Sequence, residues 1–504
     1  MPVQLGAFVR GEATVELTVW APHVQSIEVH TAGGVYPLVC GDGGLHGGRF
    51  PGEDRDEYLL ALDGKETYPD PCSRSQPHGV RAPSQVVDPS GFRWTDMRWR
   101  GVPLDDLVLY ELHVGAFSEQ GTFDGVIPRL GALRELGVTA IELMPIATFP
   151  GERGWGYDGL YSYAPHPAYG GPDGFARLVD AAHAENLAVI LDVVYNHLGP
   201  GNEALRAFGP YFTDAHETFW GDAIDYGQRG VREWALQNAE QWVRDYHVDG
   251  LRLDAVHAIF DHSQKHICAE LAERVRALRP HALVISEMRV DDWRPIEQWG
   301  HDAQWADRSH HELHVLLTRE REGYYRRYGS VRALADDLRG RGHDPRRLVV
   351  CAQNHDQVGN RALGDRLPED ALRVAAAVTL FSSCTPLLFM GEEYFERRPF
   401  QFFTDHVDPE IAKATRTGRR REFEAFSSFA GYVPDPQSVE TFLRSKLDPR
   451  EPDPFYRELL ALHRGLPREL EVVEADEGAK RLRLRRGDVE LVADFAPRRV
   501  EVRR

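Results

Sequence analysis

The octapeptide GLRLDAVH, residues 250–257, joins a short apolar run to charged residues and decides the reading of the fold. Alternate side chains of a β-strand share a face, so Arg252 and Asp254 point the same way. If that face lines a barrel interior, which aliphatic side chains normally fill, burying both charges is costly unless they pair. The octapeptide therefore predicts a strand that carries an ion pair to the end of a barrel.

Seven further apolar runs of similar length occur along the chain, and amphipathic stretches such as 174–186 and 231–245 separate most of them. Runs of β-branched and aliphatic residues, buried on both faces, are typical of parallel strands. Eight such units over this length predict an α/β fold, a (β/α)₈ TIM barrel. The predicted strands are Leu107–Glu111, Ala140–Met144, Ala188–Val193, Gly250–Asp254, Leu283–Glu287, Ala303–Ala306, Arg347–Ala352 and Pro386–Met390.

Two smaller domains are expected beside the barrel, since 504 residues exceed what one hydrophobic core usually organises. Residues 1–98 alternate in the manner of an N-terminal immunoglobulin-like β-sandwich, for example at Thr14–Trp20 and Ser26–Thr31. The barrel is assigned to residues 99–466, with a last helix at Asp453–Arg464. Residues 467–504 predict a small C-terminal β-domain, with strands at 480–485, 489–494 and 499–502.

The amino-acid composition limits the classes of molecule that the protein is expected to bind. With 59 Lys and Arg against 78 Asp and Glu, the formal net charge is -19, which argues against nucleic acid or an anionic membrane and is compatible with a neutral sugar. Five scattered cysteines show neither a disulfide framework nor metal-ligand spacing, so free thiols in a reducing cytoplasm are expected. We see no secretory signal and no run long enough to span a membrane, which predicts a cytoplasmic location.

Polar residues follow directly after four of the predicted strands, where a barrel places its active site. They are DVVYNH at 192–197, the octapeptide itself, ISE at 285–287 and QNHDQ at 353–357. A guanidinium beside Asp254 would keep that carboxylate ionised, as a nucleophile requires, whereas a general acid at Glu287 must hold its proton. Two carboxyl groups whose pKa values are pushed apart are the pattern of glycoside hydrolysis.

Each of these signals also has a structural interpretation. The segment 192–197 could be a turn with a satisfied histidine, Arg252 and Asp254 a structural ion pair, and Glu287 a surface residue at a strand end. Their order at successive predicted strand ends favours one catalytic site instead.

The four segments resemble the ordered sequence regions of the α-amylase superfamily. This resemblance implies that Asp254 is the nucleophile, Glu287 the acid/base and Asp356 a third carboxylate that supports the oxocarbenium-like transition state. It further implies that the subsite of the attacked sugar is lined by Tyr157, His197, Arg252 and His355.

Within that superfamily the chain is most similar to the malto-oligosyltrehalose trehalohydrolases, through segments such as 154–175, 193–213 and 386–406. Such enzymes cleave the α-1,4 bond next to a terminal trehalose, and they act after a malto-oligosyltrehalose synthase. The chain departs from the family after Glu287, where it reads Met-Arg-Val-Asp-Asp, and before His310. Both departures lie where the acceptor-side subsites are expected.

The polar residues expected to contact the substrate on that side are His257, Asp307, His310, His311 and Gln357. No metal and no cofactor is expected, since glycoside hydrolysis needs neither. Three other functions remain open. An α-1,4-glucan branching enzyme would pass the glycosyl group to a sugar hydroxyl, another α-glucan hydrolase would use the same carboxylates, and a carbohydrate-binding protein with an inactive barrel is opposed by the intact carboxylates.

Overall fold

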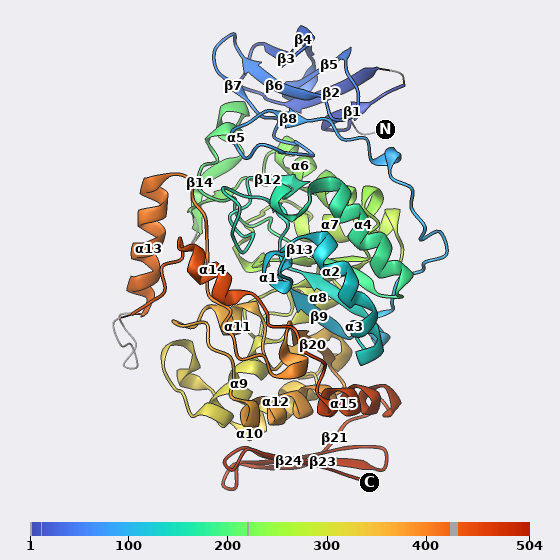
Figure 1. Cartoon of the computed structure of the whole chain (residues 1–504), viewed down its shortest axis with the longest axis vertical. Helices are drawn as coiled ribbons and strands as arrows, with labels where there is room; N and C mark the ends of the chain where they lie inside the picture. The colour runs from blue at the N-terminus through green and yellow to red at the C-terminus, as the bar shows by residue number, and fades with distance from the viewer. Residues whose placement is uncertain (1–2, 12, 219–220, 424–431) are drawn as a thin grey trace.

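A computed structural model describes residues 3–11, 13–218, 221–423 and 432–504. Three parts lie one after another along the long axis of the molecule (Figure 1). An antiparallel β-domain from the N-terminal residues lies at one end, the barrel occupies the middle, and a four-stranded sheet from the C-terminal residues closes the other end.

Eight parallel strands form the closed barrel, in the order β10-β13-β16-β17-β18-β19-β20-β9. Every one of the eight predicted runs is a strand of this barrel, so the predicted TIM-barrel fold is confirmed. The bounds are β9 Leu109–Leu112, β10 Ala140–Leu143, β13 Ala188–Val193, β16 Gly250–Leu253, β17 Leu283–Ser286, β18 Ala303–Trp305, β19 Leu348–Cys351 and β20 Thr385–Phe389.

Alternation along the strands sorts the barrel interior into layers. Aliphatic side chains such as Leu109, Ile190 and Ile285 pack together in the lower layers. Glu111 lies two residues after Leu109 on β9, so its side chain points to the same face. Arg252 on β16 lies in register with Asp192 on the neighbouring strand β13. The same alternation of side chains that fills the barrel interior with aliphatic residues therefore places charged residues at the carboxyl ends of the strands.

The helices around the barrel agree with the amphipathic stretches of the sequence. The predicted helices at 174–186, 231–245 and 453–464 correspond to α4 (Gly171–Ala184), α6 (Arg229–Asp245) and α15 (Pro454–Gly465). The Asp453 carboxylate accepts a hydrogen bond from the amide of Phe455 and so caps the start of α15. No helix of the described residues is long and apolar enough to cross a membrane.

The N-terminal β-domain docks against α6. Its strands follow the path β1-β2-β5-β4-β3-β6-β7, and β8 pairs with β6. A Cβ at Gly230, in the first turn of α6, would lie 2.0 Å from the ring of Trp20, so only glycine admits this close approach. The strands are β1 Gly6–Val9, β2 Thr14–Trp20, β3 Ile27–Thr31, β4 Gly34–Cys40, β5 Leu45–Pro51, β6 Glu57–Leu62, β7 Thr67–Tyr68 and β8 Ser84–Gln85.

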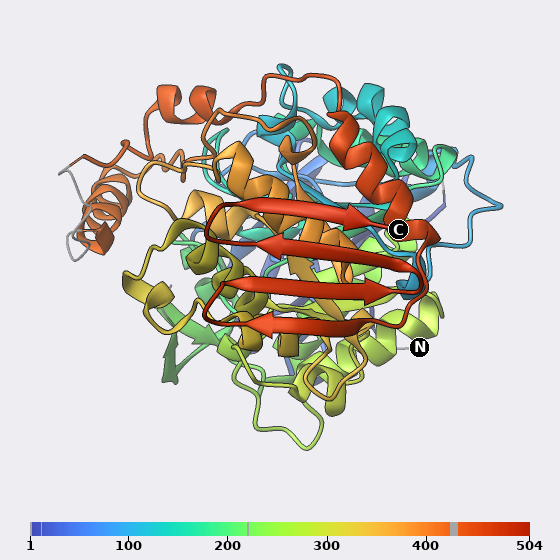
Figure 2. The same cartoon turned by 90° about the horizontal axis from the view of Figure 1, so that it is seen from below.

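The C-terminal sheet lies at one end of the molecule and packs on the outer helices α10 (Val331–Leu338) and α12 (Glu369–Phe381) (Figure 2). The three predicted strands are present as β22 (Arg481–Arg486), β23 (Val489–Asp494) and β24 (Arg499–Arg503), and the sequence reasoning missed β21 (Glu471–Asp476). Leucines of β22 and β23 are fully buried in the main core, while their arginines form cross-strand ion pairs, such as Arg481 with Asp494 at 2.6 Å.

Replacing Gly230 by alanine should weaken the docking of the N-terminal domain. The added methyl group meets the Trp20 ring, and overpacking of this kind costs about 1–3 kcal/mol. Thermal unfolding followed by circular dichroism should show a lower Tm. The matched control is Gly418→Ala in α13 (Pro409–Phe423), where a Cβ meets nothing within 4 Å and the helix should gain up to about 1 kcal/mol. Equal Tm values for both variants would contradict the close packing.

Candidate active site

A single buried guanidinium connects the carboxylates at the barrel end. One nitrogen of Arg252, Nη1, lies 2.8 Å from Asp192 Oδ2 and 2.8 Å from Asp254 Oδ1. Its second nitrogen, Nη2, donates to Glu287 Oε2 at 2.8 Å. Arg252 is completely buried and its guanidinium lies 4.2 Å from the ring centre of Trp305. The expected pair with Asp254 is therefore part of a larger cluster.

Asp254 is held at both carboxylate oxygens. While Oδ1 accepts from Arg252, Oδ2 accepts from the side-chain amide of Asn196 at 2.7 Å. The same amide also donates to the backbone carbonyl of Asp254 at 2.9 Å. Hydrogen bonds from a cation and an amide fix the orientation of this carboxyl group.

Glu287 has the opposite environment. Burial raises the pKa of Glu287 above its ordinary value, Arg252 opposes that rise, and the charge of Asp254 and a hydrogen bond to it add to the rise. The backbone amide of Ala255 also donates to Glu287 Oε2, at 3.0 Å. The raised pKa helps Glu287 to hold its proton, as a general acid must.

Tyr157 and His355 form a second connected group beside this cluster. The Tyr157 hydroxyl donates to Asp192 Oδ2 at 2.7 Å and lies 2.7 Å from Nε2 of His355. Behind His355, the carboxylate of Glu111 lies 2.5 Å from Nδ1 and accepts from the backbone amide at 2.8 Å. Burial lowers the pKa of His355, but Asp356 and Glu111 outweigh burial and raise it to about 10. His355 is therefore a cation at neutral pH.

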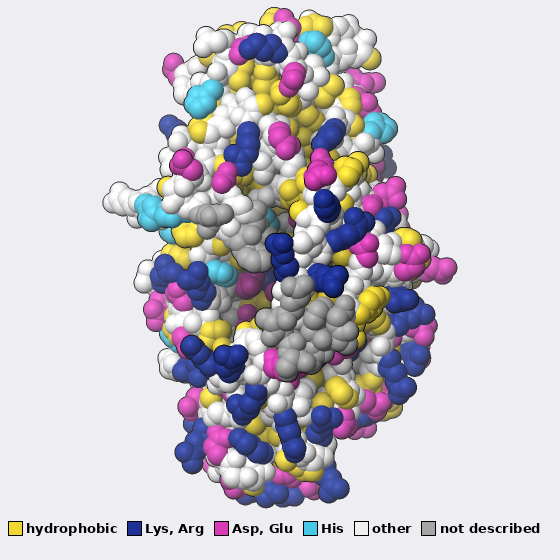
Figure 3. Space-filling model, turned by 90° about the vertical axis from the view of Figure 1, so that its left-hand side faces the viewer, with side chains coloured by type: hydrophobic (Ala, Val, Ile, Leu, Met, Phe, Trp, Pro, Cys, Tyr) yellow, Lys and Arg dark blue, Asp and Glu magenta, His cyan; other side chains and the backbone are white. Residues whose placement is uncertain are grey.

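Asp356 is the most open of the three predicted catalytic carboxylates. Its side chain is 33% exposed, against 17% for Glu287 and 9% for Asp254. Its Oδ1 accepts from the Asn360 side chain at 3.0 Å and lies 3.4 Å from His355 Nε2. A hollow in the surface, with acidic side chains visible inside it, opens on the side of the molecule that Figure 3 presents.

Two buried glutamates of the barrel were not foreseen as site residues. Glu111 and Glu142 face one another in register on β9 and β10. Glu142 is 1% exposed, and neither of its carboxyl oxygens has a hydrogen-bond partner among the described residues. Burial and the charge of Glu111 raise the pKa of Glu142 well above its ordinary value, so it is a neutral acid. The available signal was a carboxylate inside an apolar strand, in LVLYE and AIELM.

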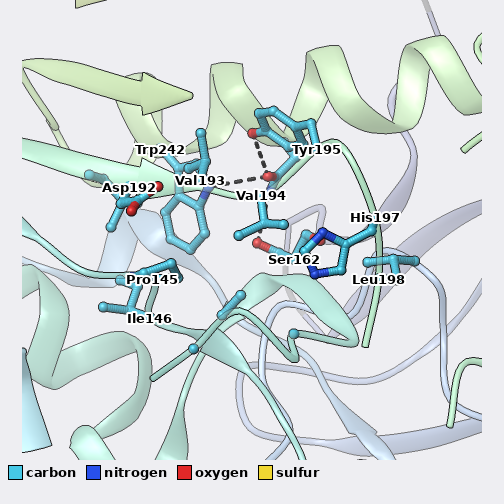
Figure 4. Close-up of a pocket in the computed structure, with 15 residues that line it drawn as sticks. Pro145, Ile146, Ser162, Asp192, Val193, Val194, Tyr195, His197, Leu198 and Trp242 are labelled. Atoms are coloured by element: carbon cyan, nitrogen blue, oxygen red, sulfur yellow. Dashed lines mark hydrogen bonds between the residues drawn. The ribbon is translucent and has the colours of Figure 1, made fainter. Parts of the chain in front are cut away.

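His197 lies behind Tyr157. Its Nε2 lies 2.9 Å from the Tyr157 carbonyl oxygen, its Nδ1 contacts Asn196, and the residue is 2% exposed. Burial lowers the pKa of His197 to about 4. It lines a small cavity of about 20 Å³ together with Asp192 (Figure 4). The neutral ring of His197 therefore supports the position of Tyr157.

Asp307 and His257 both interact electrostatically with Glu287. Asp307 begins α9 (Asp307–Thr318), directly after β18. Burial, followed by the charges of Glu287 and Asp356, raises the pKa of Asp307 to about 7. His257 is half-buried, and the charge of Glu287 acts on it. The structure thus brings these two predicted residues together with the carboxylates.

Of the remaining predicted residues, His310 and His311 lie further along α9 beside tyrosines, and Gln357 lies on α11 (His355–Gly359). His310 is 2% exposed and its Nδ1 lies 2.9 Å from the carbonyl oxygen of Ala352. His311 lies 3.5 Å from the side-chain nitrogen of Gln357, and its ring contacts are with Tyr324, Tyr325 and Tyr328. Among the described residues, none of these three side chains hydrogen-bonds to a carboxyl group of the Arg252 cluster.

The sequence reasoning also overlooked that His310 and His314 are four residues apart on α9. His314 pairs with Glu320 at 2.9 Å. Among the residues that the structure describes, no group of three or more His, Cys, Asp or Glu side chains has an arrangement that could hold a metal ion. The five cysteines all lie within the described ranges and are free.

Comparison with known proteins identifies the family. The model of the α-amylase catalytic domain matches residues 67–208. A malto-oligosyltrehalose trehalohydrolase of Rhizobium sp. (strain M-11) is 41% identical over 96% of this chain and 92% of its own length. The chain belongs to the malto-oligosyltrehalose trehalohydrolase family. It is therefore a glycoside hydrolase of the α-amylase superfamily.

Two further similarities support this placement. A crystal structure described as a putative α-amylase from Salmonella typhimurium has a TM-score of 0.90 and 36% identity, covering 98% of this chain and 93% of that one. A 1,4-α-glucan branching enzyme of Jannaschia sp. (strain CCS1) is 33% identical, but the match covers 50% of this chain and 40% of that enzyme. The branching enzyme is thus the more distant relative.

The Glu111–His355 contact predicts a pH dependence of stability. The folded pKa of about 10 exceeds the ordinary value of 6.5, so the stabilisation is complete below about 6.5 and is lost as pH rises through about 10. In Glu111→Gln the loss should occur at lower pH, because the neutral amide no longer holds the proton on His355. Thermal unfolding between pH 6 and 10 measures this shift. The control is Glu135→Gln, at a side chain that is 71% exposed. Identical pH profiles for Glu111→Gln and the unaltered protein would show that Glu111 does not set the charge of His355.

Proposed function

We propose that this enzyme hydrolyses the α-1,4-glucosidic bond next to the terminal trehalose of malto-oligosyltrehalose and releases trehalose and a malto-oligosaccharide. The observation that carries the proposal is the 41% identity to a trehalohydrolase over 96% of the chain, together with an intact carboxylate cluster around Arg252. A neutral sugar substrate also agrees with the net charge of -19.

Asp254 is the proposed nucleophile. With donors from Arg252 and Asn196 on its two oxygens, its carboxyl group is oriented before substrate binds. A lone pair of the carboxylate attacks the anomeric carbon as the bond to the glycosidic oxygen breaks, which leaves a covalent glycosyl-enzyme. Glu287 donates its proton to that departing oxygen, and it then accepts a proton from the water that hydrolyses the intermediate.

The shared guanidinium supports a retaining mechanism. Asp254 and Glu287 accept hydrogen bonds from the two terminal nitrogens of one side chain. Inverting enzymes keep their carboxyl groups about 6.5–9.5 Å apart so that a water fits between them, whereas retaining enzymes use about 5–5.5 Å. Close neighbours on one guanidinium suit the retaining arrangement.

The remaining residues of the cluster have proposed supporting roles at the attacked sugar. Asp356 places a negative charge at the open side of the cleft, where it stabilises the positive charge of the oxocarbenium-like transition state. Tyr157 and the cationic His355 contact the ring and its hydroxyls, and Arg252 and His197 hold these groups in place.

The acceptor side is proposed to recognise trehalose. A general acid protonates the leaving group, so the leaving trehalose lies on the side of Glu287, where Asp307 and His257 stand. A site whose side chains are placed to hydrogen-bond the hydroxyls of trehalose leaves some of these side chains unpaired when a sugar with another linkage binds. Such unpaired polar groups can lower the rate by orders of magnitude. His310, His311 and Gln357 complete the proposed acceptor-side contacts.

The setting of the reaction is proposed as well. The substrate carries a terminal trehalose, so a malto-oligosyltrehalose synthase is the proposed supplier. Free cysteines are compatible with a reducing cytoplasm. We keep residues 1–98, 99–466 and 467–504 as the proposed domains of the chain.

Two variants test the catalytic roles. Asp254→Asn removes the nucleophile and should lower turnover by several orders of magnitude. Glu287→Gln cannot protonate the natural leaving group, but it should retain part of its rate of glycosylation with an activated aryl glycoside, and added azide should restore some turnover. The control is Asp336→Asn, at a side chain that is 61% exposed. Near-normal turnover of Asp254→Asn, or no azide effect with Glu287→Gln, would require other assignments.

A substrate comparison tests the proposed specificity. Malto-oligosyltrehalose should be cleaved beside its trehalose unit, and much faster than a plain malto-oligosaccharide of equal length. Free trehalose and new reducing ends are measured from both substrates at matched concentration. Equal rates, or maltose as the main product from the capped substrate, would leave a general α-glucan hydrolase, and longer transfer products would indicate a branching enzyme.

A further inference from the structure

A second hollow, which we call the distal groove, lies at the same end of the barrel. Its cavity volume is about 630 Å³. Segments far apart in the sequence line it: residues 77–81 of the N-terminal domain, 150–152 and 166–168 after β10, 200–201 after β13, and 406–408 after β20. None of the predicted site residues belongs to this lining.

The barrel order places the distal groove away from the acid/base. Glu287 follows β17, and four steps around the closed barrel from β17 lies β9, flanked by β10 and β20. The leaving group must lie on the side of Glu287, because that residue protonates the departing oxygen. The rest of the chain attached to the attacked sugar therefore runs the other way, toward the loops that follow β20, β10 and β13.

The distal groove begins next to the attacked-sugar site. Asp158, the residue after Tyr157, pairs with His406 at 3.7 Å, and His406 lines the groove. The 199–201 turn is packed onto the same residue, since a Cβ at Gly199 would lie 2.3 Å from the Asp158 carbonyl oxygen. One residue thus joins the wall of the catalytic site to the wall of the groove.

The chemistry of the lining suits a neutral glucan. Pro77, Pro167 and Val407 provide apolar surface, and Val407 is 74% exposed. The C–H faces of glucose rings are apolar, whereas their edges carry hydroxyls, for which Arg81 and Glu152 are available. The volume falls within the range of about 300–1,000 Å³ that is usual for small-molecule sites.

We propose that the distal groove binds the malto-oligosaccharide part of the substrate, several glucose units beyond the cleaved bond on the non-reducing side. This inference rests on the proposed roles of Asp254 and Glu287. Residues 77–81 make the N-terminal β-domain one wall of the groove. Long substrates then gain binding contacts that short ones cannot reach, so the enzyme prefers long chains.

Two variants alter the distal groove without touching the carboxylate cluster. Ala168→Trp obstructs it at a half-buried position, and Arg81→Ala removes a polar side chain from its rim. The control for the second is Arg98→Ala, at an exposed arginine of the N-terminal segment that does not line the groove. The substrates are trehalose-capped chains with two or with six glucose units beyond the cleaved bond.

The ratio of kcat/KM for the long substrate to that for the short one is the readout. We expect Ala168→Trp to lower it by about tenfold, which corresponds to about 1.4 kcal/mol, with a smaller fall for Arg81→Ala and none for Arg98→Ala. Activity on the short substrate shows that each variant folds. An unchanged ratio in Ala168→Trp, or an equal loss on both substrates, overturns the inference.

Plain malto-oligosaccharides of the same two lengths separate this inference from the proposed function. If the capped substrates release no trehalose, the proposed specificity fails. The distal groove should still give the uncapped long chain an advantage that Ala168→Trp removes, because the groove acts on the part of the chain that both substrate series share. If Ala168→Trp removes the advantage of the long chain in the uncapped series, the groove is supported independently of the proposed function. If the advantage persists in that variant, the inference is overturned.

Discussion

The burial of one guanidinium inside the barrel is the interaction on which the site depends. Arg252 is fully removed from solvent, and an unpaired charge there would be strongly unfavourable. Three carboxylates from adjacent strands, Asp192, Asp254 and Glu287, accept its hydrogen bonds. The cation in turn offsets the negative charge that these buried carboxyl groups carry when they are ionised. The geometry of the cluster therefore follows from the need to pair the buried guanidinium with the carboxyl groups around it.

This cluster separates the tasks of two similar side chains. Asp254 receives donors on both oxygens, whereas Glu287 is buried beside the Asp254 carboxylate and keeps its proton more easily. A second charged pair, Glu111 with His355, connects through Tyr157 to Asp192. Neutral Glu142 fills the place beside Glu111 without adding another negative charge. The barrel end is thus a continuous network that is oriented before any substrate arrives.

The outer parts of the molecule extend this arrangement. The N-terminal β-domain docks closely on α6 because Gly230 leaves room for Trp20. That docking holds residues 77–81 beside the loops that follow β10 and β20, where they complete the distal groove. The C-terminal sheet packs on the outer helices α10 and α12, with buried leucines inward and ion pairs outward. One flanking domain therefore borders the distal groove, and the other packs on the outer helices of the barrel.

The sequence by itself determined the eight barrel strands and the carboxylates at their ends. Strand runs and motifs such as GLRLDAVH are local patterns, and the period of two predicted that Arg252 and Asp254 would share a face. Only the tertiary structure decided which groups meet across the barrel. Glu111 reaches His355 because closure brings β9 beside the loop after β19, and no local pattern records that contact. For the same reason the burial of His310 and the distal groove, built from segments more than 300 residues apart, became visible only in the folded chain.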